Sequence, residues 1–302
     1  MSERARIRGE RINGVLLLDK PSGMTSNAAL QKARRLLHAA KAGHTGTLDP
    51  LATGLLPLTF GEATKFSADL LNADKSYRAT IKLGVTTTTG DRDGTVVAER
   101  EVSVSNEELQ MTVSRFVGTI EQVPPMHSAL KHDGQPLYKL ARAGSEVERK
   151  PRQISVHRLA LVEYSDDEVV IDIDCSKGTY VRVLAEDMGR ALGCGAHLIA
   201  LRRTRSGRLS VSDAVTLGAL EGMPLESRIG KLLPEDELLA SLTPLLLDDA
   251  HAARFRQGQR LALEAEPRGQ RVRVYRRQNE LLGTATINEW GVIEPERVVT
   301  NI

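Results

Sequence analysis

Apolar positions near the start of the chain predict a buried strand and then a helix. Residues 15–18 form an apolar run that enters a turn at residues 20–23, as a short buried strand does. Apolar residues then recur at helical spacing between residues 29 and 37, behind Thr25 or Ser26 as the N-cap. Residues 43–61 are rich in Gly, Thr and Pro, with little periodicity until position 52, and we expect them to be largely loop.

The next part of the chain continues with a strand pattern and a helix pattern. Residues 77–83 alternate between apolar and polar positions, which predicts a strand. Ser105 with Glu108 makes a capping-box pattern ahead of a helix that ends near Phe116.

A further pair of strands and a helix complete this part of the sequence. Two β-rich runs between residues 154 and 175 flank a polar turn at residues 165–167. Residues 181–192 predict a helix that stops at Gly193. Strand and helix patterns therefore interleave along the chain, which indicates a mixed α+β core.

The last fifth of the chain has a different pattern. The segment before it contains three prolines and predicts a junction with a short helix of its own: Pro224, Pro234 and Pro244. Beyond it, residues 271–275, 281–287 and 292 onward are strand-like. We predict one large domain over residues 1–245 and a small β-rich domain over residues 246–302.

Charge changes this picture only locally, because 41 Lys and Arg residues stand against 39 Asp and Glu residues. Two clusters of arginines are candidate phosphate contacts. They are Arg202, Arg203, Arg205 and Arg208 in one cluster, and Arg4, Arg6, Arg8 and Arg11 in the other. The alternative for either cluster alone is a solvated surface without a ligand.

Several classes of protein lack support in the sequence. No P-loop pattern occurs, the run around Gly193 and Gly195 lacks the third glycine of a dinucleotide site, and the histidines have no metal-ligand spacing. The two cysteines, Cys175 and Cys194, fit neither a zinc site nor a disulfide framework. We therefore expect the protein to lie in a reducing cytoplasm. The N-terminal apolar run is too short for a signal peptide or a membrane span.

One segment is dense in glycine and small hydroxyl residues, and it is costly to order. It reads Gly43-His44-Thr45-Gly46-Thr47-Leu48-Asp49-Pro50-Leu51-Ala52-Thr53-Gly54. Pro50 favours an extended conformation at Asp49, which can project the carboxylate from the loop. Locally, an ordinary Asp-Pro turn is the stronger alternative.

The whole segment closely resembles the catalytic motif of the TruB family of pseudouridine synthases, whose aspartate lies where Asp49 lies. The resemblance extends in family order over residues 14–23, 43–54, 77–79, 128–131, 175–182 and 201–203. Two positions depart from the family pattern: His127 stands where an aromatic residue is usual, and Thr88 where an aspartate is common. Neither lies in the catalytic string, and Asp91, which matches, keeps part of the acidic character of its loop.

The resemblance implies a tRNA pseudouridine synthase, with a mainly antiparallel mixed sheet and a PUA-like C-terminal domain. It implies that the T-loop uridine at position 55 of tRNA is isomerised with Asp49 as the catalytic carboxylate. The residues expected to bind the substrate are His44, Tyr77, Tyr180, Arg182 and Leu201. The residues expected to contact RNA or support a loop are Lys20, Lys65, Asp91, Arg202 and Arg203.

Each of these positions has a simpler reading. Arg182 could form a helix-surface pair with Glu186, and Tyr77 and Leu201 could be ordinary core residues.

The isomerisation involves no net redox change or hydrolysis, so we expect no cofactor and no metal. We expect tRNA as the partner, with no guide RNA, membrane or obligatory protein partner.

Two other functions remain open from the sequence. A non-catalytic RNA-binding protein would need only the arginine clusters, with Asp49 as a turn residue. A guide-RNA-dependent synthase of the same superfamily would need partner proteins. The intact set of Asp49, Tyr77 and Arg182 argues against the first function. The bacterial-type strings and the compact tail favour a stand-alone enzyme over the second.

Overall fold

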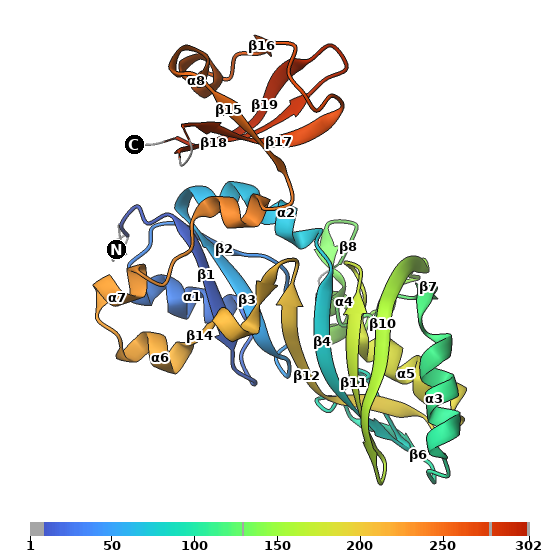
Figure 1. Ribbon diagram of the computed structural model, residues 1–302. Helices are drawn as coiled ribbons and strands as arrows, with labels where there is room; N and C mark the ends of the chain where they lie inside the picture. Colours follow the sequence, from blue (N-terminus) through green and yellow to red (C-terminus); the bar gives the residue numbers. More distant parts are fainter. Residues whose placement is uncertain (1–8, 129, 278–279, 301–302) are drawn as a thin grey trace.

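The computed structural model describes residues 9–128, 130–277 and 280–300 (Figure 1). Three of the arginines predicted to contact phosphate, Arg4, Arg6 and Arg8, lie outside the described residues, as does Ala129 of one matching string.

A mixed sheet of ten strands forms the body of the protein. Its main order is β14-β1-β3-β12-β4-β11-β10-β7, with β2 beside β3 and β13 beside β12. All neighbouring pairs are antiparallel except β1 with β14 and β12 with β3. The strands are β1 (Gly14–Lys20), β2 (Ala42–His44), β3 (Thr53–Phe60), β4 (Lys75–Leu83), β7 (Gly118–Gln122), β10 (Arg152–Ser165), β11 (Glu168–Cys175), β12 (Ala196–Ser206), β13 (Leu209–Ser210) and β14 (Val215–Thr216). The predicted α+β class, with a mainly antiparallel sheet, is confirmed.

Both faces of the central strands are buried, which explains their continuous apolar runs. On β1, Leu16 and Leu18 belong to the cluster formed with three long helices, whereas Val15 and Leu17 belong to a second cluster on the other face. The three helices are α1 (Ser26–Leu36), α3 (Asn106–Arg115) and α5 (Val181–Ala191). The sheet is therefore covered on both sides where β1 and β3 lie.

The caps predicted for two helices are present. Thr25 accepts a hydrogen bond from the amide of Ala28 at the start of α1. Ser105 and Glu108 form a complete capping box at the start of α3. Local side-chain chemistry thus sets both helix starts.

The prediction that residues 43–61 are largely loop is wrong for its second half. Thr53–Phe60 is strand β3 in the middle of the sheet, and only Thr53 in it is more than slightly exposed. A strand buried on both faces shows no alternation, and Gly54 and Pro57 are residues that usually argue against a strand. The loop that remains, residues 45–52, carries Asp49.

Shorter elements connect the sheet to the rest of the chain. They are η1 (Gly61–Phe66), α2 (Ser67–Leu71), β5 (Val85–Thr87), β6 (Val96–Glu99), β8 (Lys131–His132), β9 (Gln135–Pro136), α4 (Leu137–Arg142), η2 (Val211–Asp213), α6 (Leu217–Gly222), α7 (Leu225–Ile229) and η3 (Glu235–Leu239). No helix among the described residues is both long enough and apolar enough to cross a membrane.

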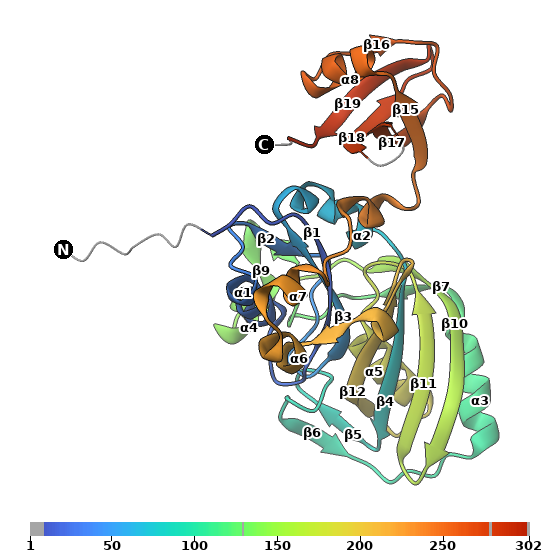
Figure 2. The ribbon, with the colours of Figure 1, turned by 60° about the vertical axis from the view of Figure 1, so that its left-hand side comes forward.

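A second, five-stranded sheet forms the C-terminal part, in the order β15-β17-β18-β19-β16. Its elements are β15 (Thr243–Leu247), α8 (Asp249–Arg256), β16 (Leu261–Ala262), β17 (Gln270–Arg276), β18 (Glu280–Ile287) and β19 (Val292–Val298). It has its own apolar cluster, centred on residues such as Phe255 and Val274. Figure 2 shows it standing beyond the first sheet on the side where α2 lies. The β-rich tail is confirmed, and the exact division at Leu245 stays a prediction.

Candidate active site

The loop that carries Asp49 is held by the turn that follows β1. Ser26 Oγ donates to the carbonyl of Leu48 at 2.9 Å and accepts from its amide at 2.8 Å. The amide of Gly23 donates to the carbonyl of Pro50 at 2.8 Å. The segment that contains residues 14–23 and the segment 43–54, which both resemble strings of the same family, therefore meet in space. Each segment orders the other.

Lys20 supports this loop from within. It is 0% exposed, and its ammonium donates to the carbonyls of Pro21 at 2.9 Å, Met24 at 2.6 Å and Pro50 at 3.4 Å. Burial lowers the pKa of Lys20 to about 8, although the charge of Asp49 opposes the shift. A phosphate cannot reach this buried ammonium. Of the two roles predicted for Lys20, RNA contact and loop support, the structure therefore favours loop support.

Arg182, in the first turn of α5, is the cation beside Asp49. Its Nε lies 3.0 Å from Asp49 Oδ2 and 3.5 Å from Asp91 Oδ2. The two terminal nitrogens donate to the carbonyls of Thr89 at 3.0 Å and His127 at 2.8 Å. The guanidinium therefore pairs with Asp49, and no ion pair with Glu186 is formed among the described residues.

Exposure differs between the two ends of this ion pair. The side chain of Arg182 is 4% exposed, whereas that of Asp49 is 37% exposed. The carboxylate therefore faces an open space while its counter-ion is fixed in the protein.

Asp91 contacts the same nitrogen of Arg182, Nε, as Asp49 does. Its side chain is 7% exposed. Its Oδ1 accepts from Thr89 Oγ1 at 2.6 Å and from the amide of Asp93 at 3.1 Å. Asp91 thus belongs to the Asp49 site, where the two carboxylates share Arg182 Nε.

Two opposing effects act on the pKa of Asp49. Burial raises it above the usual range, and the negative charge of Asp91 raises it further. The charge of Arg182, its hydrogen bond and the charge of Lys20 lower it. The net direction is upward. Among the groups that lower the pKa and so favour the ionised carboxylate, Arg182 has the largest effect.

A cavity of about 360 Å³ opens beside Asp49. Tyr77 of β4, Tyr180 before α5 and Leu201 of β12 line it together with Asp49 and Arg182. Burial raises the pKa of both tyrosines, so their hydroxyls stay protonated at neutral pH. The cavity offers apolar and aromatic walls with one carboxylate between them.

His44 lies on the other side of the same carboxylate. It lines a second cavity of about 660 Å³, which also includes Asp49, Asp91 and Arg182. Burial and the charge of Arg203 lower the pKa of His44, and its Nδ1 is buried without a hydrogen-bond partner among the described residues. The imidazole is therefore neutral at physiological pH.

The two neighbouring arginines of β12 have opposite environments. Arg203 is 1% exposed, and its guanidinium donates to the carbonyls of Leu55 at 2.7 Å and Gly46 at 3.2 Å. Of the two roles predicted for Arg203, RNA contact and loop support, its enclosure under the Asp49 loop favours loop support. Arg202 pairs with both oxygens of Asp19, at 3.0 and 2.7 Å, whereas Arg205 and Arg208 are exposed.

Lys65 lies apart from the Asp49 cavities. Its ammonium binds Glu62 Oε2 at 2.6 Å and the carbonyl of Val298 at 2.9 Å. Because these partners come from η1 and from the end of β19, Lys65 joins the two sheets. It does not contact the Asp49 loop.

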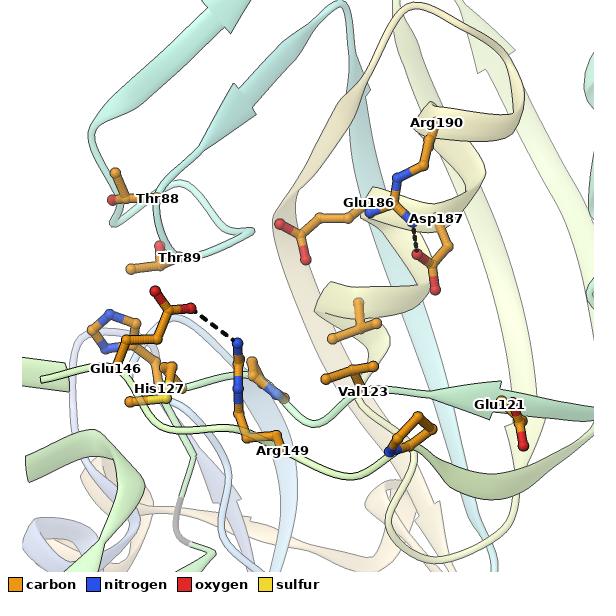
Figure 3. A pocket seen from close by; sticks show the side chains of 14 residues that line it. Thr88, Thr89, Glu121, Val123, His127, Glu146, Arg149, Glu186, Asp187 and Arg190 are labelled. Atoms are coloured by element: carbon orange, nitrogen blue, oxygen red, sulfur yellow. Dashed lines mark hydrogen bonds and ion pairs between the residues drawn. The ribbon is translucent and has the colours of Figure 1, made fainter. Parts of the chain in front are cut away.

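A further cavity of about 620 Å³ adjoins the site behind Thr89 and His127 (Figure 3). Thr88 and His127, the two departures from the family pattern, both line it. Figure 3 shows that charged side chains dominate its walls, with Arg149 bonded to Glu146 at 3.2 Å. Asp49 is not among the residues that line this cavity.

Sequence reasoning missed Lys75, which lines the cavity beside Asp49. Its ammonium donates to the carbonyls of Leu70 at 3.3 Å and Leu71 at 2.8 Å, and burial lowers its pKa to about 8. Lys75 and Tyr77 lie two residues apart on β4 and share a face, so strand alternation was the available signal.

Among the described residues, no group of three His, Cys, Asp or Glu side chains is arranged to hold a metal ion.

Family models match most of the chain. Residues 34–181 match the N-terminal domain of TruB family pseudouridylate synthase. Residues 182–245 match the tRNA pseudouridylate synthase B C-terminal domain, and residues 243–299 match the C-terminal region of pseudouridine synthase II TruB.

Named relatives match over nearly their whole length. A protein of Burkholderia mallei named tRNA pseudouridine synthase B is 55% identical over 305 residues, covering 99% of this chain and 98% of that protein. A protein of Aromatoleum aromaticum with the same name is 53% identical over 301 residues, covering 100% of this chain and 97% of that protein.

Solved structures share the fold. A chain of a Cbf5-Nop10-Gar1 complex matches with a TM-score of 0.74 and 27% identity, covering 97% of this chain and 85% of that chain. A chain of an H/ACA RNP bound to a substrate RNA containing 2'-deoxyuridine matches with a TM-score of 0.72 and 25% identity, covering 95% and 85%.

Replacing Arg182 by Gln should raise the pKa of Asp49, because the group that lowers it is lost while burial and Asp91 remain. Asp91→Asn should shift the pKa in the opposite direction. An NMR titration of the Asp49 carboxyl carbon measures both shifts. The control is Arg190→Gln, whose partner is Asp187. An Asp49 titration that does not respond to Arg182→Gln would show that the ion pair does not govern the carboxyl.

Proposed function

Because the chain belongs to the TruB family of pseudouridylate synthases, which are isomerases, we propose that it converts one T-loop uridine of tRNA, at position 55, to pseudouridine. The observation that carries the proposal is the ion pair between buried Arg182 and Asp49 at the mouth of a cavity with Tyr77 and Leu201 in its walls. An ionised, fixed carboxylate beside an aromatic wall is what this reaction needs.

The reaction breaks the bond between the ribose C1' and N1 of uracil and forms a bond between C1' and C5. The proton on C5 is released and N1 gains one, so substrate and product are isomers and no redox partner takes part. In our proposal, Asp49 supplies the nucleophile, towards the ribose or towards the base. Arg182 keeps that carboxylate charged and aimed at the cavity.

The target uridine must leave its stacked position to reach Asp49. Tyr77 and Leu201 then replace the lost stacking on the uracil, with Tyr180 as a further wall. His44, on the other side of Asp49, lies against the extruded nucleotide. The cavity holds one pyrimidine nucleoside and shields the detached base from water while it rotates.

We propose that the chain acts without a guide RNA and without an obligatory protein partner. This rests on the relatives named tRNA pseudouridine synthase B, which it matches over 97–98% of their length. The solved structures of a Cbf5-Nop10-Gar1 complex and of an H/ACA RNP share the fold at 25–27% identity. We further propose that the C-terminal sheet is a PUA-like RNA-binding domain and that the protein acts in the cytoplasm.

The purified chain alone should form pseudouridine in a tRNA transcript, at the T-loop uridine and nowhere else. Nucleotide-by-nucleotide mapping of pseudouridine after incubation measures this directly. A transcript with cytidine at the target position is the matched control. Modification that appears only after a second RNA is added would identify a guide-dependent enzyme, and its complete absence would contradict the proposed function.

In the cluster of Arg202, Arg203, Arg205 and Arg208, we propose Arg205 and Arg208 as phosphate contacts because both residues are exposed. Replacing both by Gln should weaken tRNA binding and reduce the log-log salt slope by about one unit for each lost contact. Binding titrations at several salt concentrations measure the slope, with Arg115→Gln on α3 as the control. An unchanged slope would remove these two arginines from the RNA interface.

A further inference from the structure

The C-terminal sheet contacts the body of the protein at two places. One is η3, where Asp236 accepts a hydrogen bond at 2.6 Å from the hydroxyl of Tyr275 on β17. The other is η1 together with α2, residues 61–71, which we call the docking segment. Figures 1 and 2 both show the second sheet next to α2. In the chain, the docking segment connects β3 to β4. Strand β3 follows the Asp49 loop directly, and β4 carries Tyr77 in the wall of the Asp49 cavity.

Polar contacts attach the outer side of the docking segment to the tail. Lys65 binds the carbonyl of Val298 at 2.9 Å, and the amide of Thr300 donates to Glu62 Oε2 at 2.7 Å. Arg271 of β17 donates to Asp69 Oδ1 at 2.6 Å. Asp69 is only 13% exposed, so this ion pair is partly shielded from solvent.

Apolar contacts follow the same route. Phe66 and Leu70 of the docking segment share a cluster with Leu55 of β3 and with Val299 of the tail. Phe66 and Leu55 are both 0% exposed. The tail therefore helps to close the apolar cluster beneath the central strands, in addition to its polar contacts.

The inner end of the docking segment reaches the Asp49 cavity. Leu71, the last residue of α2, lines that cavity. Lys75 holds the carbonyls of Leu70 and Leu71, and it lies two residues before Tyr77 on β4. A Cβ built on Gly46 of the catalytic loop would lie 3.8 Å from Leu71 Cδ2.

A second contact links the same end to Tyr180. Asn72, which follows α2, accepts a hydrogen bond at 2.8 Å from the ammonium of Lys177. The loop after Lys177 supplies Gly178, Thr179 and Tyr180 to the cavity wall. Movement of the docking segment would therefore shift both aromatic walls relative to Asp49.

We propose that Lys65, Asp69 and Arg271 are positioning residues for the reaction at Asp49, because they fix the docking segment that forms one wall of its cavity. The tail then contributes to the rate of the chemical step and not only to RNA binding. This inference rests on the proposed function of the Asp49 site. Removal of the tail would release the docking segment and is therefore also expected to slow the chemical step.

The test uses two variants of the full chain, Lys65→Met on the docking segment and Arg271→Gln on the tail. The substrates are whole tRNA and an isolated T stem-loop, in single turnover with saturating enzyme. Both variants should convert the stem-loop about tenfold more slowly than the wild type, since misplacement of a cavity wall lowers the rate of the bound complex. Lys65→Arg should restore most of the rate, because it keeps the charge.

Arg276→Gln is the matched control, because Arg276 pairs with Asp249 and Glu280 within the tail alone. It should leave stem-loop conversion unchanged. Wild-type rates on the stem-loop in both test variants, with a higher KM for whole tRNA only, would overturn the proposal. If Lys65→Met fails to fold, Arg271→Gln decides, since its side chain is 40% exposed and its loss is tolerated more easily.

Amide hydrogen exchange provides a readout that does not depend on activity. Exchange over residues 67–75 should be faster in both test variants than in the wild type and in Arg276→Gln. Unchanged exchange would overturn the positioning role even if the enzyme is active. Absence of pseudouridine with the wild type would instead contradict the proposed function, while faster exchange would still support the contact.

Discussion

A buried guanidinium between two carboxylates is the interaction on which the rest of the site depends. Arg182 is almost fully enclosed, and it contacts Asp49, Asp91 and two backbone carbonyls. Removing Arg182 would leave Asp91, which is 7% exposed, as an uncompensated buried charge, and a loss of this kind typically costs about 3–5 kcal/mol. The same arrangement leaves Asp49 partly open to the cavity, where a carboxylate with little hydration is a better nucleophile than one in water. Stability and the proposed chemistry thus depend on the same ion pair.

The order of strands in the first sheet brings the residues of this site together. Loop residues 45–52 begin after β2 and end at β3, while Tyr77 and Leu201 come from β4 and β12, which pair directly. Gly54 allows β3 to approach β12, because a Cβ at this position would lie 2.3 Å from the carbonyl oxygen of Arg203. Arg203 then fills the space below the loop and holds the carbonyl of Gly46. The tail completes the support from the opposite side, through the docking segment.

Features determined by neighbouring residues could be predicted from the sequence. The capping box of Ser105 and Glu108, the N-cap at Thr25 and the helix stop at Gly193 all depend on contacts within a few residues. Strand β3 could not be predicted, because burial on both faces removes the alternation that marks a strand. Alternation places Arg202 and Arg203 on opposite faces of β12, but only the tertiary structure decides which of them is inside. The contact between Asp49 and Arg182 came from family resemblance, since nothing local joins residues so distant in the chain.

The most direct test of the account is the variant Asp49→Asn, which keeps the shape of the side chain and removes its charge. Single-turnover conversion of the T-loop uridine should be measured with saturating enzyme, alongside an equilibrium binding titration of the same variant with the same tRNA. The account predicts near-normal binding with no detectable pseudouridine, because the phosphate contacts lie elsewhere. Substantial turnover by Asp49→Asn would contradict it, and lost binding with a disordered fold would show that the aspartate only orders its loop.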